Sequence, residues 1–216
     1  KNTMSNAVNV SFFLLLAQLT FGQIIPDEFG LKAGQNFSTF LFRSDKVNDL
    51  DYKYRNGSFF GTDLSFKLND RNFLRTELVA YQAGSQAIYG GNSISWRLNY
   101  IGLGAGYLFK LIDKENQYKF SFSAGIHLGI DYLLSGQQNV NKLNYDLKEV
   151  DAFRDFNFHG GPLIRAKFIV TPRLNLAMEY RFDGSLIQIE DEDKSNGQKT
   201  YNIGHLVCAG ITWNMR

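Results

Sequence analysis

One stretch of fifteen residues, 118–132, constrains the fold of this chain more than any other. Strict alternation of apolar and polar positions predicts a β-strand, because successive side chains of a strand point to opposite faces. The even positions are apolar or aromatic: Tyr118, Phe120, Phe122, Ala124, Ile126, Leu128, Ile130 and Tyr132. The odd positions are small or polar: Lys119, Ser121, Ser123, Gly125, His127, Gly129 and Asp131. At about 3.3 Å per residue and a tilt of about 45°, this strand rises roughly 35 Å, enough to cross a hydrocarbon core of about 30 Å.

The two faces of this strand indicate which side meets lipid. The apolar face carries aromatic residues at both ends, where membrane–water interfaces favour them. The opposite face suits a narrow polar lumen. In the alternative, a soluble barrel of the lipocalin kind, the apolar face would point inward and the polar face would meet water. A water-facing strand is usually rich in Lys, Glu and Thr, whereas this one alternates Gly and Ser, so the pattern favours a closed transmembrane barrel.

The composition is that of an all-β protein with many turns, with 20 Gly, 3 Pro and 15% aromatic residues. Outside the N-terminus, no run approaches the roughly 20 apolar residues that a spanning helix needs, which excludes a helical membrane protein. The net charge of +2 comes without a basic cluster, and we expect no nucleic-acid partner. The single cysteine, Cys208, excludes an intramolecular disulfide and a Cys-based zinc site.

Residues 1–22 are predicted to be a secretory signal peptide. Lys1 supplies positive charge, residues 8–17 form an apolar core, and small residues at 20–22 suit cleavage. No cysteine follows the apolar core, so the segment is not a lipoprotein signal. Residues 23–216 are then the barrel domain. Export combined with a membrane barrel predicts a bacterial outer membrane.

Eight strands are predicted, at residues 29–42, 57–68, 73–85, 95–112, 118–132, 156–170, 174–189 and 200–214. The connections between them alternate in length, and the longer, polar ones are 43–56, 86–94, 133–155 and 189–199. Outer-membrane barrels have an even strand number, short periplasmic turns and longer extracellular loops. The predicted fold class is therefore an all-β, eight-stranded antiparallel transmembrane β-barrel with both termini periplasmic.

Several strand sequences resemble the small outer-membrane β-barrels of Bacteroidota called PorT-like. The resemblance rests on Phe-Gly-Leu-Lys-Ala-Gly-Gln-Asn-Phe-Ser at 29–38, Tyr-Ile-Gly-Leu-Gly-Ala-Gly-Tyr at 100–107, Arg-Leu-Asn-Leu-Ala-Met-Glu-Tyr-Arg-Phe at 173–182 and Gly-Ile-Thr-Trp-Asn at 210–214. The chain departs from a common ending, because it finishes on Asn214, Met215 and Arg216 instead of an aromatic residue. The resemblance implies an outer-membrane location and no catalytic residues. One namesake is associated with a protein secretion system, which implies a role alongside partner proteins.

Charged residues on the predicted strands are expected to fill the lumen. An eight-stranded barrel is just wide enough for its side chains to fill, and isolated buried charges are costly, so mixed signs predict an ion-paired plug. A small conducting pore or a ligand site is the alternative. The predicted lumen residues are Lys32, Asp63, Lys67, Arg75, Glu77, Arg97, Asp131, Arg165, Lys167, Glu179, Arg181 and Asp183.

The three histidines are the candidates for chemistry. His127 and Asp131 share the inner face of one predicted strand, and His159 also has inward parity. A rim enzyme would use such a His–carboxylate pair. No nucleophile motif accompanies it, so a satisfied interior polar pair is expected instead. His205 has lipid-facing parity and is expected to lie at the interface or under a partner.

Two further motifs are not expected to bind ligands. The acidic run 191–197 lacks the glycine and glutamate spacing of an EF-hand, since Asn196 and Asn202 occupy those places, and is expected to be a solvated loop. The glycines Gly102, Gly104 and Gly106 lack the dinucleotide-binding spacing. They are expected to make room for bulky neighbours or strand curvature.

The sequence therefore predicts a non-enzymatic outer-membrane barrel, an accessory or structural subunit of a larger secretion or assembly complex. No catalytic, cofactor-binding or metal-binding residue is assigned, and no cofactor is expected. The expected partners are outer-membrane lipid, lipopolysaccharide and other outer-membrane proteins, with loops 43–56 and 133–155 and His205 as contact candidates. A rim-located enzyme and a small-solute channel are the alternatives.

Overall fold

The computed structural model describes residues 25–43, 51–114, 119–141, 143–190 and 199–215. The predicted signal segment 1–22, the start of the barrel domain at residue 23 and the acidic run 191–197 lie outside the described residues. Within those described ranges, no helix has the length and apolar character needed to span a membrane.

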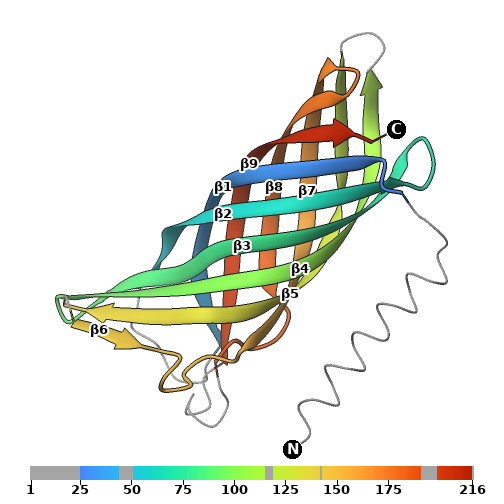
Figure 1. Cartoon of the computed structure of the whole chain (residues 1–216). Coiled ribbons are helices and arrows are strands. Elements are labelled where there is room, and N and C mark those ends of the chain that lie inside the picture. The colour runs from blue at the N-terminus through green and yellow to red at the C-terminus, as the bar shows by residue number, and fades with distance from the viewer. Residues whose placement is uncertain (1–24, 44–50, 115–118, 142, 191–198, 216) are drawn as a thin grey trace, which may run out of the picture.

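Nine strands form one antiparallel sheet. They are β1 (Glu28–Arg43), β2 (Asp51–Lys67), β3 (Asn72–Tyr89), β4 (Asn92–Lys114), β5 (Phe120–Val140), β6 (Leu143–Asp146), β7 (Phe156–Thr171), β8 (Leu174–Ser185) and β9 (Lys199–Asn214). Their order is β4-β3-β2-β1-β9-β8-β7-β5-β6, and β4 also pairs with β5. This last pairing closes the sheet into a ring of eight strands, with β6 outside the ring, as Figure 1 shows. The predicted eight-stranded antiparallel barrel is confirmed.

The first and last strands close the ring. β1 pairs with β9 along its whole length, from Glu28 opposite Asn214 to Arg43 opposite Lys199. In Figure 1 the blue β1 and the red β9 run side by side. Each barrel strand therefore has a hydrogen-bonded neighbour on both sides, which is the condition for a sheet to cross lipid without exposed backbone groups.

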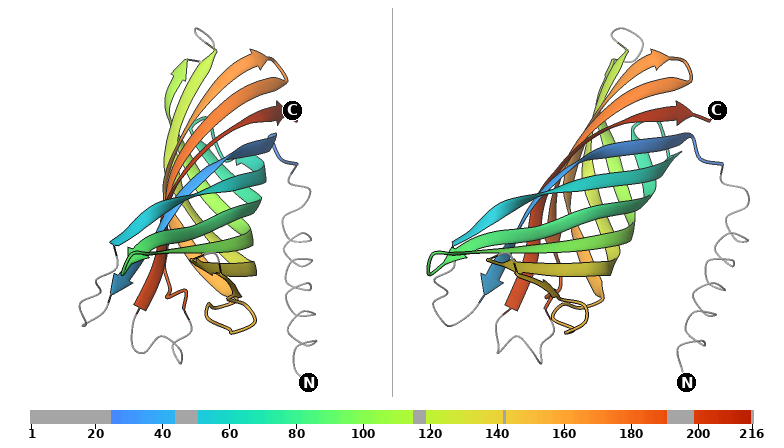
Figure 2. Two further views of the ribbon diagram at one scale, coloured as in Figure 1. Left: turned by 90° about the vertical axis from the view of Figure 1, so that its left-hand side faces the viewer. Right: turned by 60° about the vertical axis from the view of Figure 1, so that its left-hand side comes forward.

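The two ends of the barrel differ, although the predicted long connection 86–94 is a tight hairpin. We call the turn end the one that holds Glu28, Asn214 and the short connections after β2, β4 and β7. We call the opposite one the loop end. At the loop end, β3 and β4 are joined by the two-residue turn Gly90–Gly91, where both glycines have positive φ angles of 55° and 80°. Figure 2 shows this hairpin projecting beyond the other strands.

Parts of three predicted loops are strand instead: residues 51–56, residues 86–89 with 92–94, and residues 133–140 with 143–146. β2 starts at Asp51, β3 reaches Tyr89 and β5 runs on to Val140. At the end of β5 the prediction was wrong because both faces carry polar residues, which removes the period-two signal; examples are Gln137, Gln138 and Asn139. The strand predicted at 174–189 is shorter than expected and ends at Ser185.

The side chains alternate between the two faces of the barrel as predicted. On β5, Ile126 and Leu128 are 61% and 58% exposed, whereas His127 between them is 2% exposed. On β8, Met178 is exposed and the adjacent Glu179 is buried. The outer face is thus apolar and the inner face polar, the arrangement that suits a barrel with lipid outside.

Aromatic side chains lie on the outer face at two levels. Near the turn end, the rings of Phe120 and Phe168 are 5.0 Å apart. Toward the loop end, the rings of Tyr132 and Phe156 are 5.3 Å apart. The strand between these levels spans about 40 Å, or roughly 28 Å across a membrane at a 45° tilt, which matches the apolar band of outer-membrane barrels.

An apolar cluster fills the interior at the loop end, and we call it the apolar cap. It consists of Phe40, Ala83, Leu98, Tyr100, Leu133, Leu147, Phe153 and Ile189. Leu147, Phe153 and Ile189 come from the connections between strands, so these connections fold into the barrel mouth. The backbone of Phe153 also pairs with Glu190, which ties the two connections together.

A charge placed on the outer face separates a lipid-facing surface from a water-facing one. Leu128→Arg, at the middle of the apolar band, should lower the free energy of unfolding in lipid bilayers by about 2–4 kcal/mol. The matched control is Leu143→Arg on β6, where the leucine is 63% exposed but lies outside the ring. That change should stay within about 0.5 kcal/mol, as for an ordinary surface substitution. Urea titration in bilayers measures both, and equally small effects would contradict a lipid-facing exterior.

Candidate functional site

The middle of the lumen is filled by a network of buried charged side chains. Three cations and two carboxylates form its centre: Lys32, Arg75, Arg181, Glu77 and Glu179. Arg181 donates two hydrogen bonds to Glu77, of 2.6 and 2.8 Å, and one of 2.8 Å to Glu179. Arg75 donates to Glu179, and Lys32 lies 2.6 Å from Glu77. The predicted ion-paired plug is present.

Asp63 supplies a third carboxylate to this network. Its Oδ2 lies 3.7 Å from the Nζ of Lys32, and its Oδ1 lies 3.7 Å from the Nη1 of Arg165. Arg165 is further held by a 2.9 Å hydrogen bond to Thr212. Since these groups are removed from water, each depends on its opposite charges, and loss of one partner leaves an uncompensated buried charge.

Two of the predicted lumen residues lie elsewhere. Lys67 has inward parity but lies at the turn-end rim, where its half-exposed side chain pairs with Asp70 at 2.8 Å. Arg97 is exposed and shares the outward parity of Ile101. Its strand continues past the level of Tyr132 at the loop end, so an outward charge there can meet water instead of lipid. The other predicted positions face the lumen, including Lys167, which pairs with Glu28 at 2.7 Å near the turn end.

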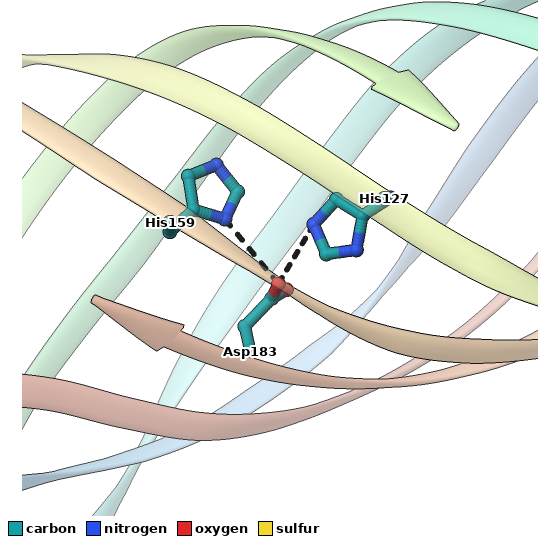
Figure 3. Close-up of side chains that lie close together, drawn as sticks. All are labelled: His127, His159 and Asp183. Atoms are coloured by element: carbon teal, nitrogen blue, oxygen red, sulfur yellow. Dashed lines mark hydrogen bonds and ion pairs between the residues drawn. The ribbon is translucent and has the colours of Figure 1, made fainter. Parts of the chain in front are cut away.

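Between the charge network and the apolar cap lies a cluster of two histidines and two aspartates. His127 comes from β5, His159 from β7 and Asp183 from β8, and their side chains converge as shown in Figure 3. The Nε2 of His127 is 2.7 Å and the Nδ1 of His159 is 3.3 Å from the same oxygen, Oδ1 of Asp183. Despite that short separation, neither ring nitrogen of His127 makes a hydrogen bond to any described residue. These three side chains are close enough to hold one metal ion.

Asp131 lies on the other side of the His159 ring. The Nε2 of His159 is 3.2 Å from Oδ2 of Asp131. The same carboxylate oxygen accepts hydrogen bonds from the hydroxyl of Tyr81 at 2.7 Å and the amide of Asn157 at 3.3 Å. Asp131 is thereby fixed in place, and it holds the orientation of the His159 ring.

The expected His–carboxylate pair exists, but with other partners. Asp131 pairs with His159, and His127 pairs with Asp183. Parity places His127 and Asp131 on one face, yet four residues along a strand separate them by about 13 Å, whereas side chains of neighbouring strands approach closely. The histidines are also buried, at 2% and 7% exposure, so neither stands at a barrel rim as the rim-enzyme alternative requires.

Small residues on the inner face make room for these side chains, as expected for two of the three glycines. A Cβ at Gly102 would lie 2.0 Å from Oδ1 of Asp131, and one at Gly104 would lie 3.0 Å from Glu77. A Cβ at Gly106 would make only ordinary contacts, so that glycine is not required for space. Gly129 likewise makes room for His159, because a Cβ added at Gly129 would lie 2.2 Å from the Nε2 of His159.

The third histidine, His205, lies on the outer face as its parity predicts. Its Nδ1 is 2.7 Å from the hydroxyl of Tyr180, and its Nε2 is 3.4 Å from that of Tyr54. Its ring also contacts Phe182. Aromatic neighbours on β2 and β8 therefore supply the hydrogen-bonding partners of His205.

The fold and the interior together define the class of protein. It is a closed transmembrane β-barrel with aromatic residues at two levels of its outer face and paired charges in its lumen. Residues 17–191 match the model of the outer membrane protein beta-barrel domain family, and the chain belongs to this family. It is therefore a protein of the bacterial outer membrane. The closing strand β9 lies beyond the matched residues.

Solved structures show the same fold. Neisserial surface protein A is 14% identical, with a TM-score of 0.50, covering 87% of this chain and 97% of that one. The outer membrane protein OprG from Pseudomonas aeruginosa is 8% identical, with a TM-score of 0.50, covering 87% and 95%. No curated protein matches the sequence.

The charge network gives a direct prediction for stability. Glu77→Gln removes the charge that faces Arg181 and Lys32, and should lower the free energy of unfolding by about 3–5 kcal/mol, as for other broken buried ion pairs. Asp70→Asn is the matched control, because it neutralises an exposed carboxylate, and should leave the unfolding midpoint nearly unchanged. Urea unfolding of the refolded barrel measures both. Similar small effects would mean that water fills the lumen and screens the charges.

Proposed function

We propose that this protein is a non-enzymatic outer-membrane barrel that acts through contacts with other outer-membrane proteins, as an accessory or structural subunit of a larger complex. The observation that carries the proposal is the filled lumen. Three cavities along the described interior have volumes of only about 20, 10 and 30 Å³. These volumes are close to the space that single water molecules need, so a solute pathway is not favoured.

The loop end offers a surface for such contacts. β6 is the last strand in the sheet order and pairs only with β5 among the described strands. Its exposed side chains include Leu143 at 63% and Tyr145 at 49%. An edge strand with apolar side chains is a template for pairing with an extended segment of another chain. We therefore assign the partner contact to the edge of β6, and its occupant is an extended segment of a second outer-membrane protein.

We also propose how the barrel is oriented in the outer membrane. The turn end carries the short connections and both ends of the barrel chain, and outer-membrane barrels turn such an end to the periplasm. The loop end, with β6, then faces outward. Outer-membrane lipid contacts the apolar band, and lipopolysaccharide lies against the aromatic level nearer the loop end.

We also propose that the chain is a PorT-like barrel, and this resemblance supports the same function. The PorT-like strand sequences lie on β1, β4, β8 and β9, so they cover both sides of the closing seam. The association of one namesake with protein secretion makes a secretion or assembly complex the favoured setting. Neither similar solved structure is named as an enzyme.

A tagged copy purified from native outer membranes in mild detergent tests the proposal. We expect a stoichiometric partner protein with the wild-type chain, and at least a tenfold loss of that partner in the double variant Leu143→Lys with Tyr145→Lys. The double variant replaces the apolar side chains of the β6 edge, which contribute no contact to the apolar cap.

Leu186→Lys is the matched control, because Leu186 is 62% exposed at the loop end but lies outside β6. It should retain the partner. A clean monomer from wild-type membranes would overturn the subunit proposal, and conductance of that monomer in planar bilayers would then favour the channel alternative.

A further inference from the structure

The cluster of His127, His159 and Asp183 contains a contact that the described residues leave unexplained. Both imidazoles direct a nitrogen at one oxygen of Asp183, at 2.7 and 3.3 Å. His127 is 2% exposed, and neither of its nitrogens is hydrogen-bonded to a described residue. A buried polar group without an aligned partner is costly, so this arrangement suits a bound group that both imidazoles and the carboxylate can contact.

The charges of the cluster also favour an additional positive group beside the two aspartates. Asp131 and Asp183 are two carboxylates with no Lys or Arg nitrogen within 4.0 Å among the described side chains; their only ion-pair contacts are to the two histidines. The nearby Arg181 is already committed to Glu77 and Glu179. These carboxylates are stabilised by nearby positive charge, which either protonated histidines or a divalent cation can supply.

The surroundings of His159 suit a metal ligand. Asp131 is fixed by Tyr81 and Asn157 and faces the Nε2 of His159, so an Nε2–H tautomer has its acceptor in place. The Nδ1 lone pair then faces the oxygen of Asp183. A second proton on His159 would satisfy this ring, but it would leave His127 without an aligned partner.

We propose that His127 Nε2, His159 Nδ1 and a carboxylate oxygen of Asp183 bind one divalent transition-metal ion, with Zn²⁺ the best match. Two imidazoles and a carboxylate are a common zinc ligand set, with bonds of about 2.0–2.2 Å and hence about 3.4 Å between donor atoms. The donor atoms here all lie within 4.8 Å of one another. A metal between them would widen the 2.7 Å contact by less than an ångström.

The surroundings are those of a built metal site. A metal-bound histidine usually donates its second ring N–H to a carboxylate, which fixes its orientation, and Asp131 takes that place for His159. A cavity of about 20 Å³ lined by His159 and Asp183 has room for a water molecule as the fourth ligand. The Asp183 side chain is 23% exposed, so the site can be reached. The sequence alone assigns no metal site, and this proposal is independent of the partner role of β6.

Metal binding to the purified full-length protein, without a polyhistidine tag, tests this inference. Metal is first removed by a chelator, and Zn²⁺ is then added back. We expect one bound Zn²⁺ per chain by elemental analysis and by titration calorimetry. His127→Ala and Asp183→Asn should each weaken binding at least a hundredfold. Asp131→Asn should weaken it about 10- to 100-fold, the usual effect of an orienting partner. His205→Ala is the matched control and should bind as the wild type does, since His205 is the remaining histidine of the chain.

X-ray absorption of the Zn²⁺-loaded wild type gives a second readout that needs no variant. We expect nitrogen and oxygen ligands with the signature of two imidazoles. Absence of bound Zn²⁺ in the wild type, a sulfur ligand from Cys208, or a loss of binding in His205→Ala would overturn the proposal. Retention of the ion in folded His127→Ala would overturn it as well, and none of these outcomes bears on the partner captured through β6.

Discussion

The pairing of β1 with β9 is the interaction on which the rest of this structure depends. A sheet in lipid cannot leave backbone groups unpaired, so the chain must return its last strand to its first. This pairing joins Glu28 to Asn214 and continues to Arg43 and Lys199. Closure at eight strands also fixes a narrow lumen, and that narrowness decides what the interior can be.

A narrow interior turns the inward residues into a packed core made largely of polar groups. The charges of Lys32, Arg75 and Arg181 face Glu77 and Glu179, and an apolar cap covers the loop end. The glycines opposite Asp131 and Glu77 are part of the same packing, because a Cβ there would collide with these side chains. A packed lumen favours a function at the ends or outer surface of the barrel, or in the histidine cluster, over a function as a through-channel.

The sequence predicts the fold and much of the interior, because alternation in a strand depends only on parity. It places Ile126 and Leu128 outside and His127 inside, as the structure does. It misses the strand ends beyond the membrane, where residues such as Gln137 and Gln138 meet water on both faces. It also cannot bring His127 to Asp183, since their meeting depends on the registers of β5, β7 and β8. The prediction that Arg97 faces the lumen was wrong, because Arg97 shares the outward parity of Ile101 and lies on the part of β4 beyond the level of Tyr132.

Cross-linking of β1 to β9 would test directly whether the barrel is closed. Ala33 and Ala209 are direct partners on the outer face, and cysteines at both positions, in a Cys208→Ala background, should be joined within one chain by an oxidant or a short thiol cross-linker. Cysteines at Ala33 and Ala105, on β1 and β4, should not be joined, because two strands separate them in the ring. Cross-linking of Ala33→Cys, Ala209→Cys in the folded protein at high yield is the predicted result. No cross-link within the chain, or links only between chains, would contradict a closed barrel.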